Sequence, residues 1–561
     1  MQRETKTSAA EGGGKAYEPL DARTPKDLLR LRDTTLQGDS LEGEDNDDAF
    51  VISVGRASMH RRLRGLSDDA LEMGDTDDSL SASTVSTSRV EQQRLRTEFD
   101  VEEEDEPDGC MPWMQVAVLA LSAISGFLFG YDLCVMVVAL PLIHEAMDLS
   151  TTAAQSVVSV LMVGAFFGSL AGGVLADRIG RKPAIIWTGM FFLAGSFCMT
   201  FAPSFSVLLG GRFLAGLAVG SSAPCVSAYV AEIARPEHRG ALVTINEVMV
   251  CIGCLVSVCV SVSLKESSNG WRKMLGLTLL PPIVQLIGMP LMPESPRWLI
   301  AQKDRAQDAK AVLQRLFPHN DADTEIKMQM ANQVLNKGFW DVVHEIRSDR
   351  TTRRRVVLSI LIALAHTLTG ANAMLYYSSY ILDSLNPSVA FTANLSKEYG
   401  VAVAKVAGVC TAVAVVDRIG RRPLILFGSL VMVLCQFVFA ACFWRLETAP
   451  MGNFEALGIW NLYVYIYAWN LSWAPLMWVI CSEILPDDVR SIGMGLTFAV
   501  YWLGSSLVNQ TLLSMFDSLG MTGTFSIYAA LTSLALVFLF WKVPETRGLS
   551  FEQITKLFQA K

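Results

Sequence analysis

The chain has 561 residues, of which 51% are hydrophobic, and it carries a formal net charge of −9. Because the first 110 or so residues are strongly polar, the apolar residues must be concentrated in the rest of the chain. The negative charge comes largely from that polar tail, which argues against a protein that binds nucleic acid.

Residues 1–110 are expected to form a disordered cytoplasmic tail. They are acidic, rich in Ser and Thr and poor in aromatic residues, a composition that cannot bury enough apolar surface to fold. The chain starts with "MQRETKTSAAEGGGK", which lacks the apolar core of a signal peptide. We therefore expect the first membrane helix to act as the targeting signal.

Twelve apolar runs follow the tail, and each has about 18 residues or more, which is long enough to cross a bilayer core as a helix. Helix is the required form, because a lone strand cannot satisfy its backbone hydrogen bonds in lipid. The runs lie near 113–138, 153–176, 184–201, 205–230, 240–264, 272–292, 355–383, 398–416, 423–443, 457–482, 491–513 and 521–542. The sequence thus predicts an all-α membrane protein with twelve transmembrane helices.

The eleven Cys residues are scattered, mostly within these apolar runs. We expect them to be buried as small hydrophobic residues and not joined in a disulfide framework. Cys251 and Cys254 form one CxxC without a second pair, and the sequence has no Walker loop. We therefore expect no metal, no other cofactor and no ATP-driven pumping.

The chain also repeats itself. "DRIGRKP" begins at Asp177 and recurs as "DRIGRRP" at Asp417, 240 positions later; "EIARPEHR" at 232–239 recurs as "EILPDDVR" at 483–490, 251 positions later. "PESPRW" recurs as "PETRG" at the same offset of 251. Three motifs in one order at nearly one offset predict two duplicated halves, an arrangement that suits alternating access. The expected segments are a tail at 1–110, an N-terminal six-helix half at 111–292, a cytoplasmic helical linker at 293–354, a C-terminal six-helix half at 355–543 and a cytoplasmic tail at 544–561.

Lys and Arg are concentrated in the loops that follow the second, fourth, sixth and eighth runs. The positive-inside rule puts these loops and both termini in the cytoplasm. Asn394, in "NLS", would then lie outside as a candidate for glycosylation, with an unused sequon as the alternative. The plasma membrane is the expected location.

The chain resembles the sugar porter family of the major facilitator superfamily. The resemblance covers about residues 113–550 and rests on the combination of GGVLADRIGRK, PESPRWL, TGANAMLYY, SWAPLMW and PETRG. The wording of "RGALVTIN" is most similar to the proton-linked myo-inositol and hexose branch. The resemblance implies the major facilitator fold and transport of a sugar or polyol.

The resemblance also implies a cytoplasmic gate, in which charged groups at helix ends form a latch that opens as the halves tilt. Exposed ion pairs are individually worth only about 0–1 kcal/mol, so a latch needs a network that can break and re-form. The gate residues are Asp177, Arg178, Arg181, Glu232, Arg239, Asp417, Arg418, Arg421, Glu483 and Arg490. For some of the Arg residues the alternative is a simple topology anchor.

Asp132 lies near the middle of the first apolar run, where an ionisable side chain costs several kcal/mol and needs a partner. The resemblance implies that the partner is Arg212, because proton-coupled sugar porters carry an Asp and an Arg at these two positions. Proton uptake by Asp132 would weaken its hold on Arg212 and free the N-terminal half to change packing. The alternative is a structural pair in a facilitative uniporter.

The resemblance implies a substrate site of amides, which hydrogen-bond hydroxyls, and aromatic rings, which stack on sugar C–H faces. The residues that match the family are Phe129, Asn372, Tyr376, Tyr377, Trp478 and Trp502, and those that replace family amides are Glu247, His366, Thr367 and Tyr501. Glu247 and His366 are titratable, and we expect them to be able to pair with each other and to carry protons.

The predicted function is secondary active transport, in which a proton and a small polar solute, such as a hexose or myo-inositol, cross together by alternating access. Two alternatives stay open: a facilitative sugar uniporter, and a non-transporting nutrient sensor on the same fold. An enzyme is not expected, because no nucleophile–base set stands out. The expected partners are the solute, the proton and the lipid bilayer, with no nucleic acid, and the protein is expected to be a monomer.

Overall fold

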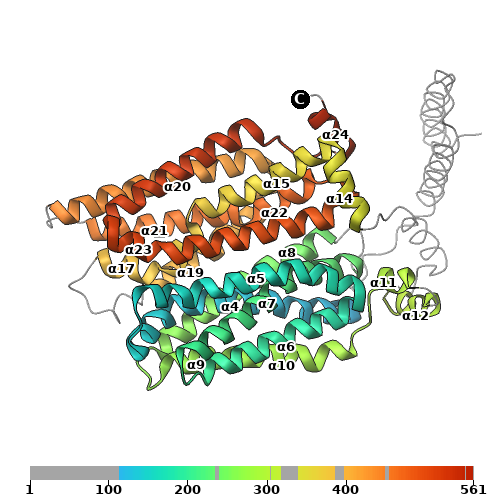
Figure 1. Cartoon of the computed structure of the whole chain (residues 1–561), viewed down its shortest axis with the longest axis horizontal. Helices are drawn as coiled ribbons and strands as arrows, with labels where there is room; N and C mark the ends of the chain where they lie inside the picture. Colours follow the sequence, from blue (N-terminus) through green and yellow to red (C-terminus); the bar gives the residue numbers. More distant parts are fainter. Residues whose placement is uncertain are drawn as a thin grey trace, which may run out of the picture. The chain divides into compact units, whose positions relative to one another are not determined.

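The computed structural model describes residues 113–233, 239–302, 305–316, 339–385, 397–448, 454–549 and 551–559. Every regular element among these residues is a helix (Figure 1), which agrees with the predicted all-α class. The predicted tail at 1–110 and the sequon at Asn394 lie outside the described residues.

The N-terminal half consists of long helices followed by a broken sixth span. Its elements are α4 (Trp113–Met147), α5 (Thr151–Ile179), α6 (Arg181–Thr200), α7 (Phe205–Ile233), α8 (Arg239–Leu264), α9 (Gly270–Gly276), η1 (Leu277–Leu279), α10 (Leu280–Gly288) and η2 (Met289–Leu291). Gly164 and Gly168 of α5 let α7 approach closely, because a Cβ at either position would lie 2.3 Å from a backbone oxygen of α7. Small residues at a crossing let membrane helices gain van der Waals contact between their backbones.

The C-terminal half contains two interrupted spans. Its elements are α15 (Arg350–Leu368), α16 (Ala371–Tyr376), α17 (Ser378–Leu385), α19 (Glu398–Ile419), α20 (Arg421–Thr448), α21 (Phe454–Leu471), α22 (Trp473–Ile484) and α23 (Asp487–Lys542). Gly370, with φ of 74°, separates α15 from α16, and Ser472 separates α21 from α22. Shorter helices lie between and after the halves: α11 (Pro296–Ala301), α12 (Ala306–Leu316), α14 (Phe339–Ser348) and α24 (Phe551–Gln559).

Eleven helical segments of the described chain are long and apolar enough to cross a membrane. The last of them, Ile492–Lys542, has 51 residues and contains both the eleventh and the twelfth predicted runs. Gly520 has non-helical backbone angles inside it, φ 70° and ψ 169°, and divides it into two helices. All twelve predicted spans therefore have a counterpart.

The two halves meet along two main seams, where α5 packs against α23 and α8 packs against α19, and α16 and α17 also contact α4. In Figure 1 the N-terminal half is coloured blue to green and the C-terminal half yellow to red. We call the end of the bundle where α4 ends and α5 begins the far end, and the end that carries the DRIGR motifs the motif end.

Hydrogen bonds between the halves, within the described ranges, involve the parts of the helices toward the far end. Ser379 Oγ donates to the carbonyl oxygen of Val137 at 2.8 Å. Ser514 Oγ donates to Gln155 Oε1 at 3.0 Å, and Gln510 Nε2 donates to the carbonyl oxygen of Thr152 at 3.3 Å. The halves are thus joined by hydrogen bonds toward the far end.

The expectation about cysteines is wrong for one pair. Cys134 of α4 and Cys254 of α8 form a disulfide, with their Cα atoms 5.0 Å apart. The reason lies one helical turn earlier, where a Cβ on Gly130 would lie 1.8 Å from the carbonyl oxygen of Val250. The two helices run in parallel, so this close approach also brings together the residues four positions further on.

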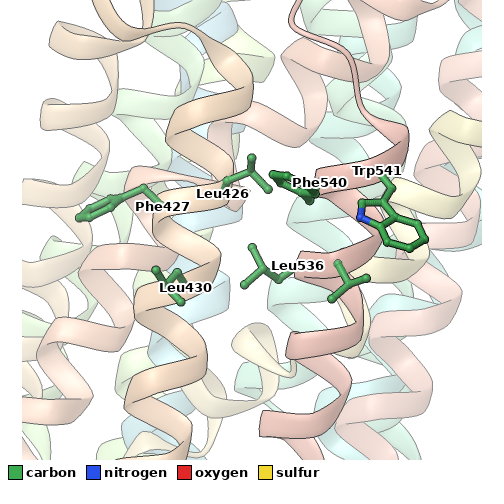
Figure 2. Close-up of a pocket in the computed structure, with 7 residues that line it drawn as sticks. Leu426, Phe427, Leu430, Leu536, Phe540 and Trp541 are labelled. Atoms are coloured by element: carbon green, nitrogen blue, oxygen red, sulfur yellow. The ribbon is translucent and has the colours of Figure 1, made fainter.

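A shallow apolar groove lies on the outer surface of the C-terminal half, between α20 and α23 (Figure 2). It is lined by Leu426, Phe427, Leu430, Leu536, Val537, Phe540 and Trp541. Trp541 is 71% exposed. Such a surface suits contact with lipid chains, and it lacks the convergent polar groups that a site for a polar solute requires.

Candidate functional site

A buried ion pair joins helices of the N-terminal half. Arg212 Nη1, in α7, donates to both carboxylate oxygens of Asp132, in α4, at 2.8 and 2.9 Å. The side chain of Arg212 is 0% exposed and that of Asp132 is 5% exposed. Arg212 Nε also donates to the carbonyl oxygen of Val157 in α5, at 3.0 Å. The guanidinium therefore ties α4, α5 and α7 together at a point where water cannot compensate its charge.

This ion pair lies next to the other half. Tyr376, in α16, is close enough to interact electrostatically with both Arg212 and Asp132, and α16 packs against α4. Arg212 Nη2 is buried and has no hydrogen-bond partner among the described residues. The sequence identified Tyr376 as a match to the family within the TGANAMLYY motif, but it did not place this residue beside the ion pair. The pair thus has one unused donor and a tyrosine of the C-terminal half beside it.

His366, in α15, lies inside a cluster of rings. Its imidazole stacks on Trp473 with ring centroids 5.4 Å apart, and the ring of Tyr501 is 5.2 Å away. Trp469 Nε1 donates to His366 Nε2 at 2.9 Å, and Met477 Sδ is 3.1 Å from Nδ1. A histidine that accepts at one nitrogen is suited to the neutral form with its proton on the other. His366 therefore holds the aromatic cluster together.

Asn372 is a partly exposed amide beside the aromatic cluster. Its Nδ2 donates to the Tyr501 hydroxyl at 2.6 Å and to Ser505 Oγ at 3.4 Å, so α23 fixes its orientation. The break at Gly370 starts a new helix two residues before it, and the side chain is partly exposed. Asn372 and Tyr501, one matching the family and one replacing an amide, thus form a single polar unit.

Tyr377 and Thr367 are occupied by the protein itself. The Tyr377 hydroxyl donates to the carbonyl oxygen of Asn509 at 3.0 Å, and the Thr367 hydroxyl donates to that of Leu364 at 2.8 Å. Both residues are buried. Their predicted contact with substrate stays a prediction, since in this arrangement each hydroxyl is committed to the backbone.

Aromatic side chains from both halves meet between them. Phe129 of α4 and Trp502 of α23 make an edge-to-face contact with centroids 5.7 Å apart. Trp478 of α22 stacks on Phe498 at 4.1 Å and meets the edge of Tyr501 at 5.1 Å. Phe498 was not expected in the cluster, and it covers one face of the Trp478 indole. Stacking with a sugar would therefore have to use the other face.

Glu247, in α8, does not pair with His366 as expected, since the two ring nitrogens of His366 are used by other neighbours. Glu247 instead interacts electrostatically with Lys405, in α19 of the other half. Lys405 is 4% exposed and lies against the Trp469 ring, with Nζ 5.3 Å from the centroid. Sequence reasoning missed Lys405, although a lysine within "VAVAKVAGVC" is as conspicuous as Asp132 in its run.

One further carboxylate is buried within a span. Glu398, at the start of α19, accepts a hydrogen bond from Ser378 Oγ at 2.9 Å. No group of three or more His, Cys, Asp or Glu side chains suited to a metal ion occurs in the described ranges.

At the motif end, the charged residues of the N-terminal half form one cluster. Arg181, the first residue of α6, pairs with Glu232 at 3.0 Å and with Asp177 at 3.1 Å. Glu294, which follows the sixth span, accepts the backbone N–H groups of Arg181 and Lys182 at 3.0 and 3.1 Å. Burial raises the pKa of Glu294, whereas these N–H groups, that of Ser295 and the Arg181 charge act to lower it. The carboxylate thus caps the N-terminus of α6.

The C-terminal half builds the same cluster from the repeated motifs. Arg421 pairs with Asp417 at 3.1 Å and with Glu483 at 3.2 Å. Glu545 accepts the backbone N–H groups of Arg421 and Arg422, both at 3.0 Å, and so caps α20. Each of these two clusters lies within one half.

The glycine of each DRIGR motif makes this cap possible. Gly180 has φ of 105° and Gly420 has φ of 103°, a region that other residues rarely adopt. A Cβ would lie 2.3 Å from Glu294 Oε2 at Gly180, and 2.8 Å from Glu545 Oε2 at Gly420.

The remaining predicted gate residues differ in their surroundings. Arg178 and Arg418 are exposed. Arg490 Nε donates to the carbonyl oxygen of Ser482 at 2.9 Å. The side chain of Arg239 lies outside the described residues.

Comparison with known proteins gives consistent matches over the membrane-spanning region. A family profile described as "Sugar (and other) transporter" matches residues 118–558. The chain is 33% identical over 451 residues to the galactose-proton symporter of Escherichia coli, covering 79% of this chain and 94% of that protein. It is 30% identical over 456 residues to the major myo-inositol transporter IolT of Bacillus subtilis, covering 79% and 94%.

Among solved structures, the chain matches the inward-open conformation of the xylose transporter XylE from E. coli. The TM-score is 0.65 at 24% sequence identity, and the match covers 79% of this chain and 99% of that one. At this identity the match supports the fold, which is that of a major facilitator protein.

Proposed function

Because the chain belongs to the family of sugar (and other) transporters, we propose that it is a secondary active transporter that moves a sugar or polyol together with a proton by alternating access. The observation that carries the proton part is the buried pair of Asp132 and Arg212. The solute part is supported by the amide and aromatic residues gathered between the halves, and by relatives named as galactose-proton, arabinose-proton and myo-inositol transporters.

Asp132 can couple a proton to movement because its charge balances Arg212. When Asp132 is ionised, the two groups form a compact pair that needs no water. When Asp132 takes up a proton, the buried guanidinium loses its counter-charge, a situation that costs several kcal/mol unless the packing changes. The unused Nη2 and the neighbouring Tyr376 of the C-terminal half offer a way to relieve that cost. Protonation would therefore alter the contact between the halves.

The solute would bind between the halves, where Asn372 and Tyr501 supply hydrogen bonds and Phe129, Trp478 and Trp502 supply ring surfaces. His366 would act by holding the rings in place. A hexose or myo-inositol is the proposed solute. Thr367 and Tyr377 would need to release their backbone partners to take part.

The proposed topology puts the motif end and both termini in the cytoplasm of a plasma-membrane monomer. The two charge clusters would then act as the inner gate, and the exposed Arg178 and Arg418 could bridge them when the motif end closes. Arg239 and Arg490 are proposed as further members of that gate. Because the described hydrogen bonds between the halves lie toward the far end, this arrangement would be closed to the outside. The segment limits at 110, 292, 354 and 543 remain part of the proposal.

The test is uptake by purified protein in liposomes with an imposed pH gradient. Radiolabelled D-glucose, D-galactose, L-arabinose and myo-inositol are each offered with and without a protonophore. A coupled transporter accumulates at least one of them above its outside concentration, and the protonophore abolishes the accumulation. A uniporter only equilibrates its solute, and a sensor binds it without uptake. Either of these two results would overturn the proposal.

A further inference from the structure

The buried lysine of the C-terminal half has donors without acceptors. Lys405 is 4% exposed, and within the described ranges it makes no hydrogen bond and no ion pair. Its surroundings are the face of Trp469, 5.3 Å from Nζ, and the charge of Glu247 on the opposite half. Lys405 Nζ is not one of the fully buried side-chain atoms that lack a partner in the described part of the chain, so its donors reach accessible space. Within a membrane span, an ionisable side chain marks a functional site by default.

The carboxylate facing this lysine is also uncommitted. Glu247 is partly exposed and accepts no hydrogen bond from a described residue. Cys251, one helical turn further along α8, also interacts electrostatically with Lys405 of α19. Glu247 therefore lies on the side of α8 that packs against α19. Opposite charges from the two halves are thus within electrostatic range but not in direct contact.

The Lys405 ammonium is positioned by the aromatic ring on which it lies. The Trp469 ring beneath it is held by its own hydrogen bond to His366, at 2.9 Å, which anchors the indole in the aromatic cluster. A cation over an indole face is stabilised without using its N–H donors. Lys405 is therefore held in place while its donors stay available to a solute.

We propose that Lys405 and Glu247 form a solute clamp across the seam of α8 and α19, which binds neighbouring hydroxyl groups and selects neutral polyhydroxy solutes over charged ones. A hydroxyl can donate to the carboxylate of Glu247, and the next hydroxyl oxygen can accept from the ammonium of Lys405. Such charge-assisted bonds are stronger than neutral ones. An anionic solute would meet the Glu247 carboxylate and a cationic solute the Lys405 ammonium, so both are disfavoured. This inference rests on the proposed transport function.

The test exchanges one charge at a time and measures which probes bind. D-Glucuronate serves as the anionic probe and D-glucosamine, below the pKa of its amine, as the cationic probe. The neutral probes are D-glucose, D-galactose, L-arabinose and myo-inositol. Binding to full-length purified protein is measured by isothermal titration calorimetry for wild type, Glu247→Gln, Lys405→Met and the double variant. Lys397→Met is the matched control, because Lys397 belongs to the same α19 region but pairs with Glu455 at 2.9 Å.

The expected results differ in sign between the variants. Glu247→Gln should gain affinity for D-glucuronate and Lys405→Met should gain affinity for D-glucosamine, while each loses about 10- to 100-fold in affinity for the neutral solute. The double variant should recover part of the neutral binding and bind neither charged probe. The control should keep the wild-type selectivity.

The inference is overturned if both single variants bind the neutral solute as wild type does, or lose it without any gain for a charged probe. Lys405→Gln replaces Lys405→Met if the latter elutes as an aggregate, with the same expected gain. If the wild-type protein binds none of the neutral probes, the proposed function falls together with the clamp. If it binds and transports them but charge selectivity does not follow the variants, only the clamp falls.

Discussion

The sharpest test of coupling is the replacement of Asp132 by Asn. Among the described residues, Asp132 supplies the carboxylate that compensates Arg212, through bonds of 2.8 and 2.9 Å at a side chain that is 0% exposed. The Asn amide oxygen can keep one of the two hydrogen bonds but removes the negative charge. Breaking a buried ion pair costs about 3–5 kcal/mol, and the retained hydrogen bond places Asp132→Asn near the lower end of that range.

The transport readout follows from the energy of the proton gradient. With one proton per solute, one pH unit supplies about 1.4 kcal/mol, which supports about tenfold accumulation. A membrane potential of about 100 mV adds about 2.3 kcal/mol, which multiplies the ratio by about 50. Asp132→Asn has no proton to exchange, so its accumulation ratio should fall to one while exchange of labelled for unlabelled solute continues.

The assay uses proteoliposomes loaded at a defined internal pH, with accumulation and equilibrium exchange measured on the same preparation. Asp132→Glu is the matched control, because it keeps a titratable group within reach of Arg212 and should keep some accumulation. Thermal unfolding shows whether each variant is folded. If Asp132→Asn reached the wild-type accumulation ratio under the same gradient, Asp132 would not be the coupling group.

Three further predictions concern single features of the structure. Gly180→Ala should lower the free energy of unfolding by about 1–3 kcal/mol, because the position has φ of 105° and an added Cβ meets Glu294. Gly173→Ala is the control, since a Cβ there meets nothing within 4 Å, and it should be neutral or stabilising. Thermal unfolding measures both variants. Hydrogen bonds from Thr352 and Thr351 lower the pKa of Asp349 at the start of α15 below its ordinary 3.8, so Asp349→Ala should cost about 1 kcal/mol at neutral pH. Because the pKa of Asp349 is lower in the folded protein than in the unfolded chain, the stability difference between wild type and Asp349→Ala is complete above the ordinary pKa. It should shrink as the pH falls through the pKa of the folded protein. Asp349→Asn can still cap the helix, so it should lose little stability at any pH. Alkylation of unreduced denatured protein should leave Cys134 and Cys254 unmodified and give a peptide linked through both, which is absent from Cys254→Ser; modification of both residues in wild type would contradict the disulfide.

The spans and the two halves could be predicted because both signals are local to the sequence. A run of apolar residues long enough to cross a bilayer fixes a helix, and the recurrence of the Asp177 motif at Asp417 marks the duplication. The pair of Asp132 and Arg212 was found because a lone charge in lipid demands a partner, and the resemblance supplied which one. Its geometry then agreed with the expectation.

The partners across helices could not be predicted in the same way. A helical pattern shows which side of a helix is apolar, but not which helix faces it, and this is why Glu247 was assigned to His366 and not to Lys405. The disulfide of Cys134 with Cys254 depends on the close approach at Gly130, which only tertiary packing reveals. An ionisable residue within an apolar span marks a functional site, and this applies to Lys405 as it does to Asp132. Lys405 could therefore have been predicted from the sequence.

The paired helix caps bear on whether the two halves can be produced as separate polypeptides. Glu294 follows the sixth span and holds the start of α6, and Glu545 follows the twelfth and holds the start of α20. In each half, a carboxylate that follows the sixth span of that half therefore caps a helix of the same half. Neither cap needs a residue of the other half. Two separately encoded polypeptides, divided within the segment between the halves and produced in one cell, should therefore assemble into a working carrier.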